Sequence, residues 1–486
     1  MSYYILSGDC PQDSEREIAE KVTKMSERPN LLYIQYDQQR YDCVSMSHIF
    51  DVKTPNLERI ADNGAFFENC YTPIPVCAPA RQALFSGRRP EMYGGLWNPH
   101  IVFPVAGIDK SIWSWTRAIR EAGYNTAYAG CWEVDPKAQP SDYGFEHFVS
   151  RGDFNKYISD RYPDVKYTNG FFGEPNPVKL EDSFTHQIAK HAIGWIEEFT
   201  KQDKPWYIHL DSPEPHLPCR PSEPFSSMYD PDKLTPWGSI GETFEGKPYI
   251  QKQQLINWKL EDRTWENGWK YTAAMYYGII SQYDNAVGLI LDALERSGQM
   301  ENTIIVYVTD HGDMCGGHRL IDKHYNMYDD ITHIPMAMRW DGRIKPNRVK
   351  SFAQSMLDIP ATLCGLMGIE SPDGWFQGKD MSSDLCGGVS FDGRDTAVST
   401  YNGQQFGLFC ERMICGERYK YVWNPTDIDE FYDREIDPNE LRNEIGNPEY
   451  KDIIADYRIR LHDELKRCSD PLIGWTADQL LAGRKI

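Results

Sequence analysis

Three apolar stretches, far apart in the chain, each end in residues that can carry chemistry. Leu31 to Tyr36 is followed by Asp37, Trp206 to Leu210 by Asp211, and Thr303 to Val308 by Asp310. Stretches of this length and apolar content are typical of buried parallel strands. Helical patterns lie between them, at residues 111–122 and 271–296. This alternation predicts an open α/β sheet whose ligands bind beyond the carboxyl ends of its strands. Asp37, His216 and Asp310 are therefore expected on one rim.

Charge and composition limit the partners of the chain. It has 486 residues and a formal net charge of −21. That charge argues against nucleic acid and against an anionic membrane surface, because like charges repel. The sequence contains no stretch of 18 apolar residues, so we expect no membrane helix. The first 30 residues lack the pattern of a secretory signal. The 12 cysteines form no C-x-x-C pair, so we expect a cytoplasmic enzyme with reduced thiols.

The sequence pattern changes near residue 378. Residues 1–377 are predicted to form a catalytic domain, with an N-terminal extension at 1–28 and an insert rich in aromatic residues at 220–270. Beyond this point the expected strands are short, at 412–415, 419–423 and 430–433, and a helix follows from about 448 to 468. Residues 378–486 are therefore predicted to form a small α+β subdomain with a short antiparallel sheet.

The segment Cys77-Ala78-Pro79-Ala80-Arg81 has the form C-x-P-x-R and continues to Gly87-Arg88. Pro79 suits the first turn of a helix, so Cys77 is expected near a helix N-terminus, which favours an oxyanion. The segment resembles the signature of type I sulfatases, in which the cysteine is oxidised after translation to formylglycine. A buried structural thiol is the alternative interpretation of Cys77.

The resemblance covers residues 29–443 and implies an alkaline-phosphatase-like sandwich. In that fold a large, mostly parallel central sheet is flanked by helices, and the small C-terminal subdomain packs beside it. The resemblance also implies a divalent cation, with ligands at Asp37, Gln38, Cys77 as formylglycine, Asp310 and His311. Calcium is expected first and manganese second, because oxygen ligands suit a hard cation and an imidazole widens the choice. A separate maturation enzyme is implied as the partner that converts Cys77.

Other positions are similar to the family's substrate contacts. The resemblance implies that Arg81 steadies the charged hydrate, that Lys323 contacts a sulfate oxygen, and that His216 protonates the departing alcohol. The further substrate-binding candidates are Asn98, Glu133, His318 and His324. For the two histidines a structural role is the alternative, and for Glu133 it is a solvated or salt-bridged side chain.

Two departures from the family pattern keep a second activity open. Many sulfatases have Asp-Asp where this chain has Asp37-Gln38, and Gly-Lys-Trp-His where it has Gly130-Cys131-Trp132-Glu133. The second change removes two cationic substrate contacts. Asp-Gln combined with Asp-His is similar to phosphonate monoester hydrolases and choline sulfatases, so a phosphonate monoester or phosphodiester hydrolase is the alternative. A catalytically silent binding protein is disfavoured, because the nucleophile, the arginine, the lysine and the metal-type residues are all present.

The expected function is hydrolysis of a sulfate ester by attack of the formylglycine hydrate at sulfur. The substrate is expected to be a small molecule or oligosaccharide, with a sulfated carbohydrate preferred. Aromatic faces of the insert suit sugar rings, although each tryptophan there is expected to pack the insert onto the core. Whether the chain forms a homo-oligomer is left open by the sequence.

Overall fold

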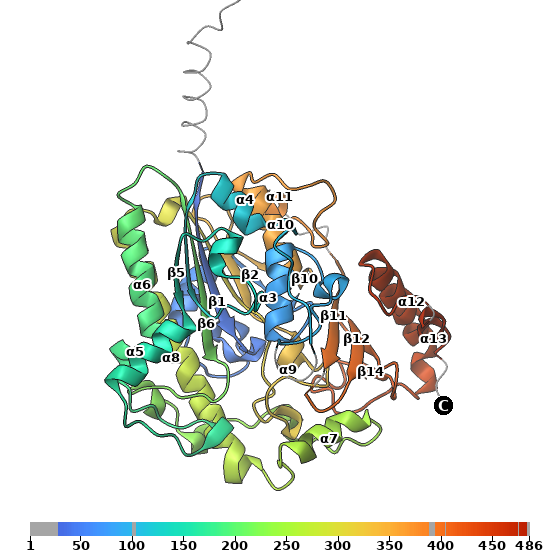
Figure 1. The fold of residues 1–486 in the computed structure, drawn as a ribbon. Helices are drawn as coiled ribbons and strands as arrows, with labels where there is room; N and C mark the ends of the chain where they lie inside the picture. Colours follow the sequence, from blue (N-terminus) through green and yellow to red (C-terminus); the bar gives the residue numbers. More distant parts are fainter. Residues whose placement is uncertain (1–27, 100–103, 388–393, 404, 475, 484–486) are drawn as a thin grey trace, which may run out of the picture.

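One eight-stranded sheet forms the centre of the molecule (Figure 1). Across the sheet the strands are β5 (His147–Ser150), β4 (Asn125–Gly130), β6 (Trp206–Pro215), β1 (Asn30–Asp37), β7 (Thr303–Thr309), β8 (Met336–Arg339), β2 (Ala65–Phe67) and β9 (Asn347–Val349). The strands from β5 to β7 are all parallel, whereas β8 is antiparallel to both of its neighbours. The predicted α/β class with a large, mostly parallel central sheet is confirmed.

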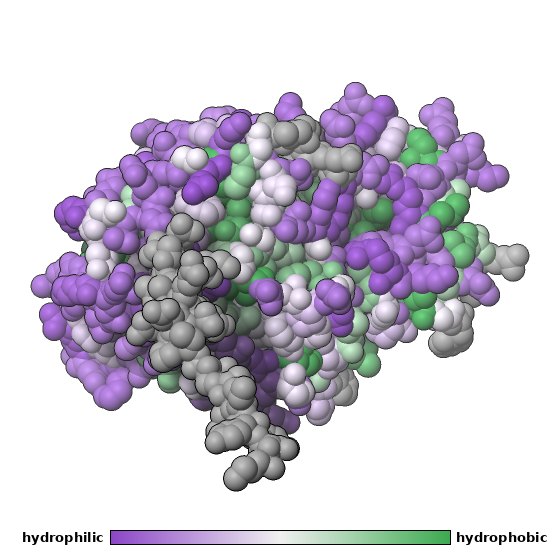
Figure 2. Space-filling model, turned by 90° about the horizontal axis from the view of Figure 1, so that it is seen from above, coloured by the Kyte–Doolittle hydropathy of each residue, from purple (hydrophilic) through white to green (hydrophobic). Residues whose placement is uncertain are grey.

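The computed structural model describes residues 28–99, 104–387, 394–403, 405–474 and 476–483. The predicted N-terminal extension therefore lies, except for residue 28, outside the described residues. Within these ranges no helix is long and apolar enough to cross a lipid bilayer. Seen from the side on which β1 begins, the surface is mostly hydrophilic (Figure 2).

Strand β1 illustrates why the apolar stretches become central strands. All eight of its residues are buried, and their side chains alternate between the two faces of the sheet. Leu31 and Tyr33 pack into the core on one face, whereas Leu32, Ile34 and Tyr36 pack into the core on the other. Both faces of the sheet are therefore covered, as a parallel sheet requires.

Helices form the two outer layers (Figure 1). The first face is covered by α3 (Cys77–Ser86), α4 (Trp115–Glu121) and α10 (Ser355–Met367), and the second by α2 (Pro55–Ala61), α6 (Phe184–Phe199) and α8 (Lys270–Arg296). Shorter or peripheral helices are α5 (Arg151–Arg161), α9 (Asp329–Thr332) and α11 (Ser382–Gly387). The helix expected at 271–296 is confirmed, but the one expected at 111–122 begins later, because the backbone of Ser114 is extended.

The aromatic insert packs onto the core around α8. It contains short 3-10 turns, one helix, α7 (Tyr249–Asn257), and a π-helical turn over Trp265–Trp269 that leads into α8. Trp237, Trp265 and Trp269 are buried in a third hydrophobic cluster shared with α8. For these three tryptophans, the expectation that the insert's aromatic side chains mainly pack is confirmed.

A four-stranded antiparallel sheet follows in the C-terminal part of the chain. Its strands are β11 (Thr396–Gly403), β12 (Phe409–Gly416), β13 (Tyr419–Trp423) and β14 (Glu430–Asp433), paired in sequence order. The sequence predicted the last three and missed β11. One face packs under α12 (Lys451–Arg467) and α13 (Ala477–Ala482), whereas Ala397, Met413 and Val422 join the core of the main sheet. The small sheet is confirmed, and the boundary at residue 378 stays a prediction.

A substitution at Gly130 tests how closely the backbones of β4 and β6 must approach each other at the carboxyl end of the sheet. Its φ is +125°, and a Cβ there would lie 1.8 Å from the carbonyl oxygen of Asp211. We expect Gly130→Ala to lower the free energy of unfolding by about 3 kcal/mol or more, through steric overlap and backbone strain. Thermal and urea unfolding measure the change.

The matched control is Gly194, an exposed glycine inside α6 whose Cβ would meet nothing within 4 Å. Gly194→Ala should be neutral or stabilising by up to ~1 kcal/mol. Equal unfolding midpoints for the two variants would contradict the packing argument.

Candidate active site and metal centre

The carboxyl ends of three neighbouring parallel strands carry the acidic residues of the site. Asp37 ends β1, Asp310 follows β7, and Asp211 lies in β6. In the sheet register, Gln35 of β1 lies beside Asp211 on one side and Val308 on the other. The side chains expected on one rim therefore do meet there, because parallel strands end at the same edge.

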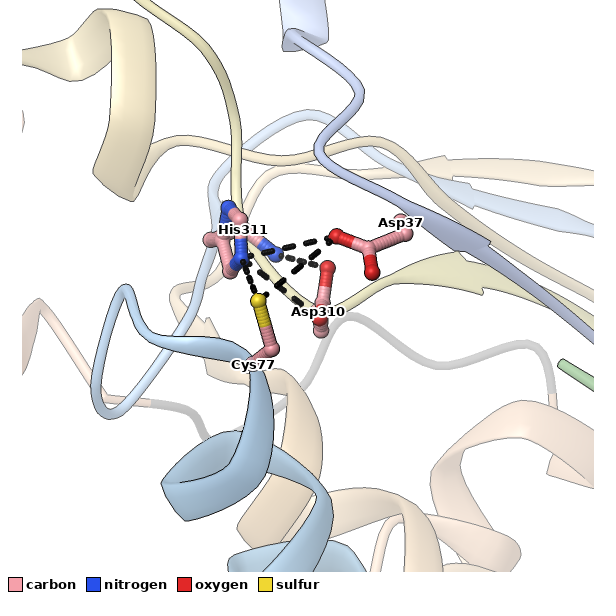
Figure 3. A group of neighbouring side chains, drawn as sticks. All are labelled: Asp37, Cys77, Asp310 and His311. Carbon is pink, nitrogen blue, oxygen red and sulfur yellow. Dashed lines mark hydrogen bonds and ion pairs between the residues drawn. The ribbon is translucent and has the colours of Figure 1, made fainter. Parts of the chain in front are cut away.

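Helix α3 brings Cys77 to this edge. Cys77 is the first residue of the helix, and its Sγ lies 3.3 Å from Nε2 of His311 and 3.9 Å from Oδ1 of Asp37 (Figure 3). Ligand atoms of Asp37, Cys77, Asp310 and His311 all lie within 4.8 Å of one another, and all four residues are buried. The Nδ1–H of His311 donates to the carbonyl of Gly312 at 2.9 Å, which leaves the Nε2 lone pair for the cluster.

Arg81 lies one helical turn after Cys77 and is fully buried. Its guanidinium makes two parallel bonds to Asp211, at 2.8 and 2.9 Å, and single bonds to Asp310 at 2.6 Å and Asp37 at 3.1 Å. Its contacts are thus with carboxylates that line the cluster. The geometry favours a role in positioning these carboxylates, and the predicted direct contact with a charged hydrate stays a prediction.

Asp211 is a residue of this site that the sequence analysis placed after an apolar stretch but did not choose as a candidate. Tyr128 donates a hydrogen bond to its Oδ2 at 2.9 Å, beside the two bonds from Arg81. Burial raises the pKa of Asp211 and the Arg81 guanidinium lowers it, with a net rise to about 6. The available signal was its place directly after a buried apolar stretch, the same signal that identified Asp37 and Asp310.

Lys323 and His216 form a second group beside the cluster. The Lys323 Nζ lies 2.7 Å from His216 Nε2, 2.8 Å from Gln38 Oε1 and 3.3 Å from Asp322 Oδ1. The carboxylate of Asp322 raises the pKa of Lys323 against the effect of burial, and Cys77 and Asp37 raise it further. A cation is thus held next to the cluster.

Gln38 has a positive φ of 71° and uses its amide in this second group. Its Nε2 donates to Asp313 at 2.5 Å and to Asp322 at 3.0 Å, whereas its Oε1 accepts from Lys323. Because a carbonyl oxygen has two lone pairs, Oε1 of Gln38 can accept from Lys323 and still offer the other pair to a cation. The role of Gln38 as a metal ligand stays a prediction.

His216 is polarised from both sides. Its Nδ1–H donates to the carbonyl of Leu217 at 2.7 Å, and its Nε2 lies 2.7 Å from Nζ of Lys323. Burial and Lys323 lower the pKa of His216, but Asp37 and Cys77 raise it, with a net rise to about 9. The raised pKa favours the imidazolium form, in which Nε2 of His216 carries a proton that a departing oxygen can take up.

Two of the other predicted substrate-binding residues, Asn98 and Glu133, lie near the start of α3 and near Arg81. Asn98 Oδ1 accepts from the backbone N–H of Ala78 at 2.9 Å, so Asn98 is fixed at the start of α3. Glu133 Oε2 lies 3.6 Å from Arg81 Nη1, and its side chain is 30% exposed. Glu133 is thus the partly open acidic group at this side of the site.

The two remaining histidines differ in position. His324 Nε2 bonds to Asp322 Oδ2 at 2.9 Å, next to Lys323. His318 instead bonds to Glu242 of the insert at 2.7 Å and stacks on Tyr328 at 3.5 Å. The structure therefore brings His324 to the second group, whereas His318 lies in a buried contact between the insert and the core.

Comparisons with known families match most of the chain. The family described as Sulfatase matches residues 29–369, and the one described as N-sulphoglucosamine sulphohydrolase, C-terminal, matches residues 316–467. The chain is 27% identical over 466 residues to an ulvan-active sulfatase of Formosa agariphila, covering 91% of this chain and 82% of that protein.

It is 24% identical over 488 residues to an N-acetylglucosamine-6-O-sulfatase of Bacteroides thetaiotaomicron, covering 87% of this chain and 84% of that protein. Among solved structures, the phosphonate monoester hydrolase of Agrobacterium radiobacter matches with a TM-score of 0.77 and 24% identity. That match covers 91% of this chain and 96% of that one. The structural likeness supports the fold.

The Asp211→Asn variant tests whether the charge of Arg81 must be neutralised by Asp211 for the cluster to hold a cation. In Asp211→Asn the guanidinium would keep Asp37 and Asp310 as its only carboxylate partners within hydrogen-bond distance among the described residues, and would compete with a cation for them. We expect about 10- to 100-fold weaker binding of Ca²⁺ or Mn²⁺, measured by calorimetric titration. Asp292→Asn, at a half-exposed ion pair with Arg59, is the control; unchanged affinity in Asp211→Asn would refute this role.

Proposed function

The chain belongs to the sulfatase family of sulfuric ester hydrolases, and on that premise we propose that it removes sulfate from a sulfated carbohydrate, with formylglycine made from Cys77 as nucleophile. The observation that carries the proposal is the position of Cys77 at a helix N-terminus, beside two carboxylates and an imidazole lone pair. A relative named for the 6-O-sulfate of N-acetylglucosamine supports the substrate class.

The donor set fits a divalent cation. Around Arg81, three buried carboxylates face one guanidinium, and buried excess charge is costly unless it is paired. Asp37, Asp310, His311 and the modified Cys77 would hold the cation, with Gln38 as a further candidate. Calcium is the first choice and manganese the second. When bound, such a cation lowers the pKa of an adjacent hydroxyl.

The proposed reaction uses both hydroxyls of the formylglycine hydrate. One hydroxyl loses its proton and its oxygen attacks the sulfur; the ester S–O bond breaks, and the departing alkoxide takes up a proton. The second hydroxyl then loses its proton, the bond between the carbon and the sulfate oxygen breaks, and sulfate leaves. The aldehyde that remains is hydrated again by water. Conversion of Cys77 requires a separate maturation enzyme.

The other residues of the site orient charge and protons. Lys323 would pair with a sulfate oxygen, because its ammonium lies next to the cluster. His216 would protonate the departing oxygen once Lys323 has turned to the substrate. Asn98 holds the first turn of α3, and Arg81 keeps the carboxylates in place.

Gln38 and Glu133 favour a second candidate, a phosphonate monoester or phosphodiester hydrolase on the same scaffold. An amide replaces a carboxylate in the first pair, and a carboxylate stands where many family members have a cationic histidine. The likeness in fold to a phosphonate monoester hydrolase is compatible with this activity.

Turnover of matched substrates separates the two candidates. Protein produced together with a maturation enzyme should hydrolyse an aryl sulfate and sulfated monosaccharides faster than an aryl phosphonate. The peptide with residue 77 should be lighter than the cysteine form, and Cys77→Ala should lose at least about 10³-fold in kcat/KM because no nucleophile remains. A large excess for the phosphonate would overturn the proposal in favour of the second candidate.

Lys323 is the residue whose charge should matter most for a sulfate group. Lys323→Ala should lower kcat/KM by about 10²- to 10³-fold, since a preorganised cation next to the developing charge is lost. Lys53→Ala removes a half-exposed lysine that pairs with Asp51 and serves as the control. A loss in Lys323→Ala no larger than that in the control would rule out a sulfate contact.

A further inference from the structure

One tryptophan of the insert differs from the others in its surroundings. Trp237, Trp265 and Trp269 are buried among the side chains of α8 and its neighbours. Trp258, directly after α7, is only half-buried. It packs against the same cluster, but its ring also contacts two aromatic rings that come from outside the insert, so packing of the insert alone does not account for its position.

Four aromatic side chains form a row from the surface inward, which we call the aromatic row: Phe171, Trp258, Phe406 and Tyr325. Phe171 meets Trp258 edge-on at 5.2 Å, Trp258 meets Phe406 edge-on at 6.1 Å, and Phe406 lies over Tyr325 at 6.0 Å. These residues belong to four separate segments of the chain. Phe171, at the outer end of the row, is 51% exposed.

The inner end of the row lies at the second group of the site. Tyr325 follows Lys323 by two residues, and its ring lies 6.3 Å from that of His324. The Tyr325 hydroxyl accepts from the N–H of Phe406 at 2.6 Å and donates to the carbonyl of Gly407 at 3.0 Å. The loop that carries Phe406 is therefore tied to the segment that carries Lys323.

Helix α7 is tied to the same segment. Gln254 is buried and its Nε2 donates to the carbonyl of Ile321, two residues before Lys323, at 3.4 Å. The helix that precedes Trp258 and the loop that carries Phe406 are thus each hydrogen-bonded to the segment 321–325, which contains Lys323. The row begins next to a cation of the site and ends at an exposed ring.

We propose that the aromatic row is the wall of the substrate cleft on which the sugar ring bearing the sulfate stacks, with Trp258 and Phe406 as its specificity-determining residues. This inference rests on the proposed function. A sugar ring has an apolar C–H face that packs on an aromatic ring, while its hydroxyls stay in water. A row of aromatic rings that leads from the segment of Lys323 to an exposed ring suits a ligand that is apolar on one face and anionic at one substituent.

The test compares a sugar sulfate with a sulfate ester that has no ring. Wild type, Trp258→Ala and Phe406→Ala are assayed with methyl sulfate and with heparin-derived sulfated disaccharides. We expect KM for the disaccharide to rise about 3- to 10-fold in each variant, the size of an aromatic contact. The kinetic constants for methyl sulfate should stay within error, and Trp258→Phe should recover most of the loss.

Phe148→Ala is the matched control, because Phe148 is 43% exposed on the edge strand β5. Unfolding midpoints of all variants are measured alongside. If the disaccharide KM is unchanged, or if both substrates lose activity in proportion to a lower midpoint, the row only packs the insert and the inference is wrong. Turnover of methyl sulfate without turnover or binding of any disaccharide by wild type would overturn the inference and the proposed carbohydrate substrate, but would leave sulfate ester hydrolysis standing. Absence of all sulfate turnover would overturn the proposed function as well.

Discussion

The pairing of Arg81 with three carboxylates is the interaction around which the site is built. A fully buried guanidinium is stable only when its donors are satisfied, and here Asp37, Asp211 and Asp310 satisfy them from three adjacent strands. The same contacts fix the rotation of α3 about its axis. Because Cys77 lies one turn earlier on that helix, its sulfur is directed into the gap between Asp37 and His311.

The two cationic side chains of the site, Arg81 and Lys323, have different surroundings. Arg81 lies behind the cluster and is wholly engaged by acidic groups, whereas Lys323 lies beside it and shares its ammonium among His216, Gln38 and Asp322. Only Lys323 can turn to an incoming anion without leaving buried carboxylates unpaired. The net charge of −21 makes such a local cation necessary for any anionic substrate.

The segment after β4 shows how the chain differs from the common family pattern. Trp132 donates its Nε1–H to the carbonyl of Ala138 and packs edge-on against Phe85 and Tyr128, so it serves the core. Glu133 then reaches toward Arg81, with 3.6 Å between its Oε2 and Arg81 Nη1. The substrate would therefore meet a carboxylate on this side and cationic and aromatic groups on the other.

The sequence by itself determined the parts that depend on local pattern. Buried strands β1, β6 and β7, the helix that starts at Cys77 and the acidic residues at the strand ends all follow from apolar runs and their flanking residues, and the family resemblance added Lys323 and His216. The roles of Asp211, Arg81 and His318 depend on contacts between distant segments, because their side-chain hydrogen-bond partners lie between 44 and 229 residues away. The tertiary structure also gives Trp258 ring contacts with residues outside the insert. Burial and ring contacts between distant segments leave no periodic trace in the chain, so they cannot be inferred from neighbouring residues.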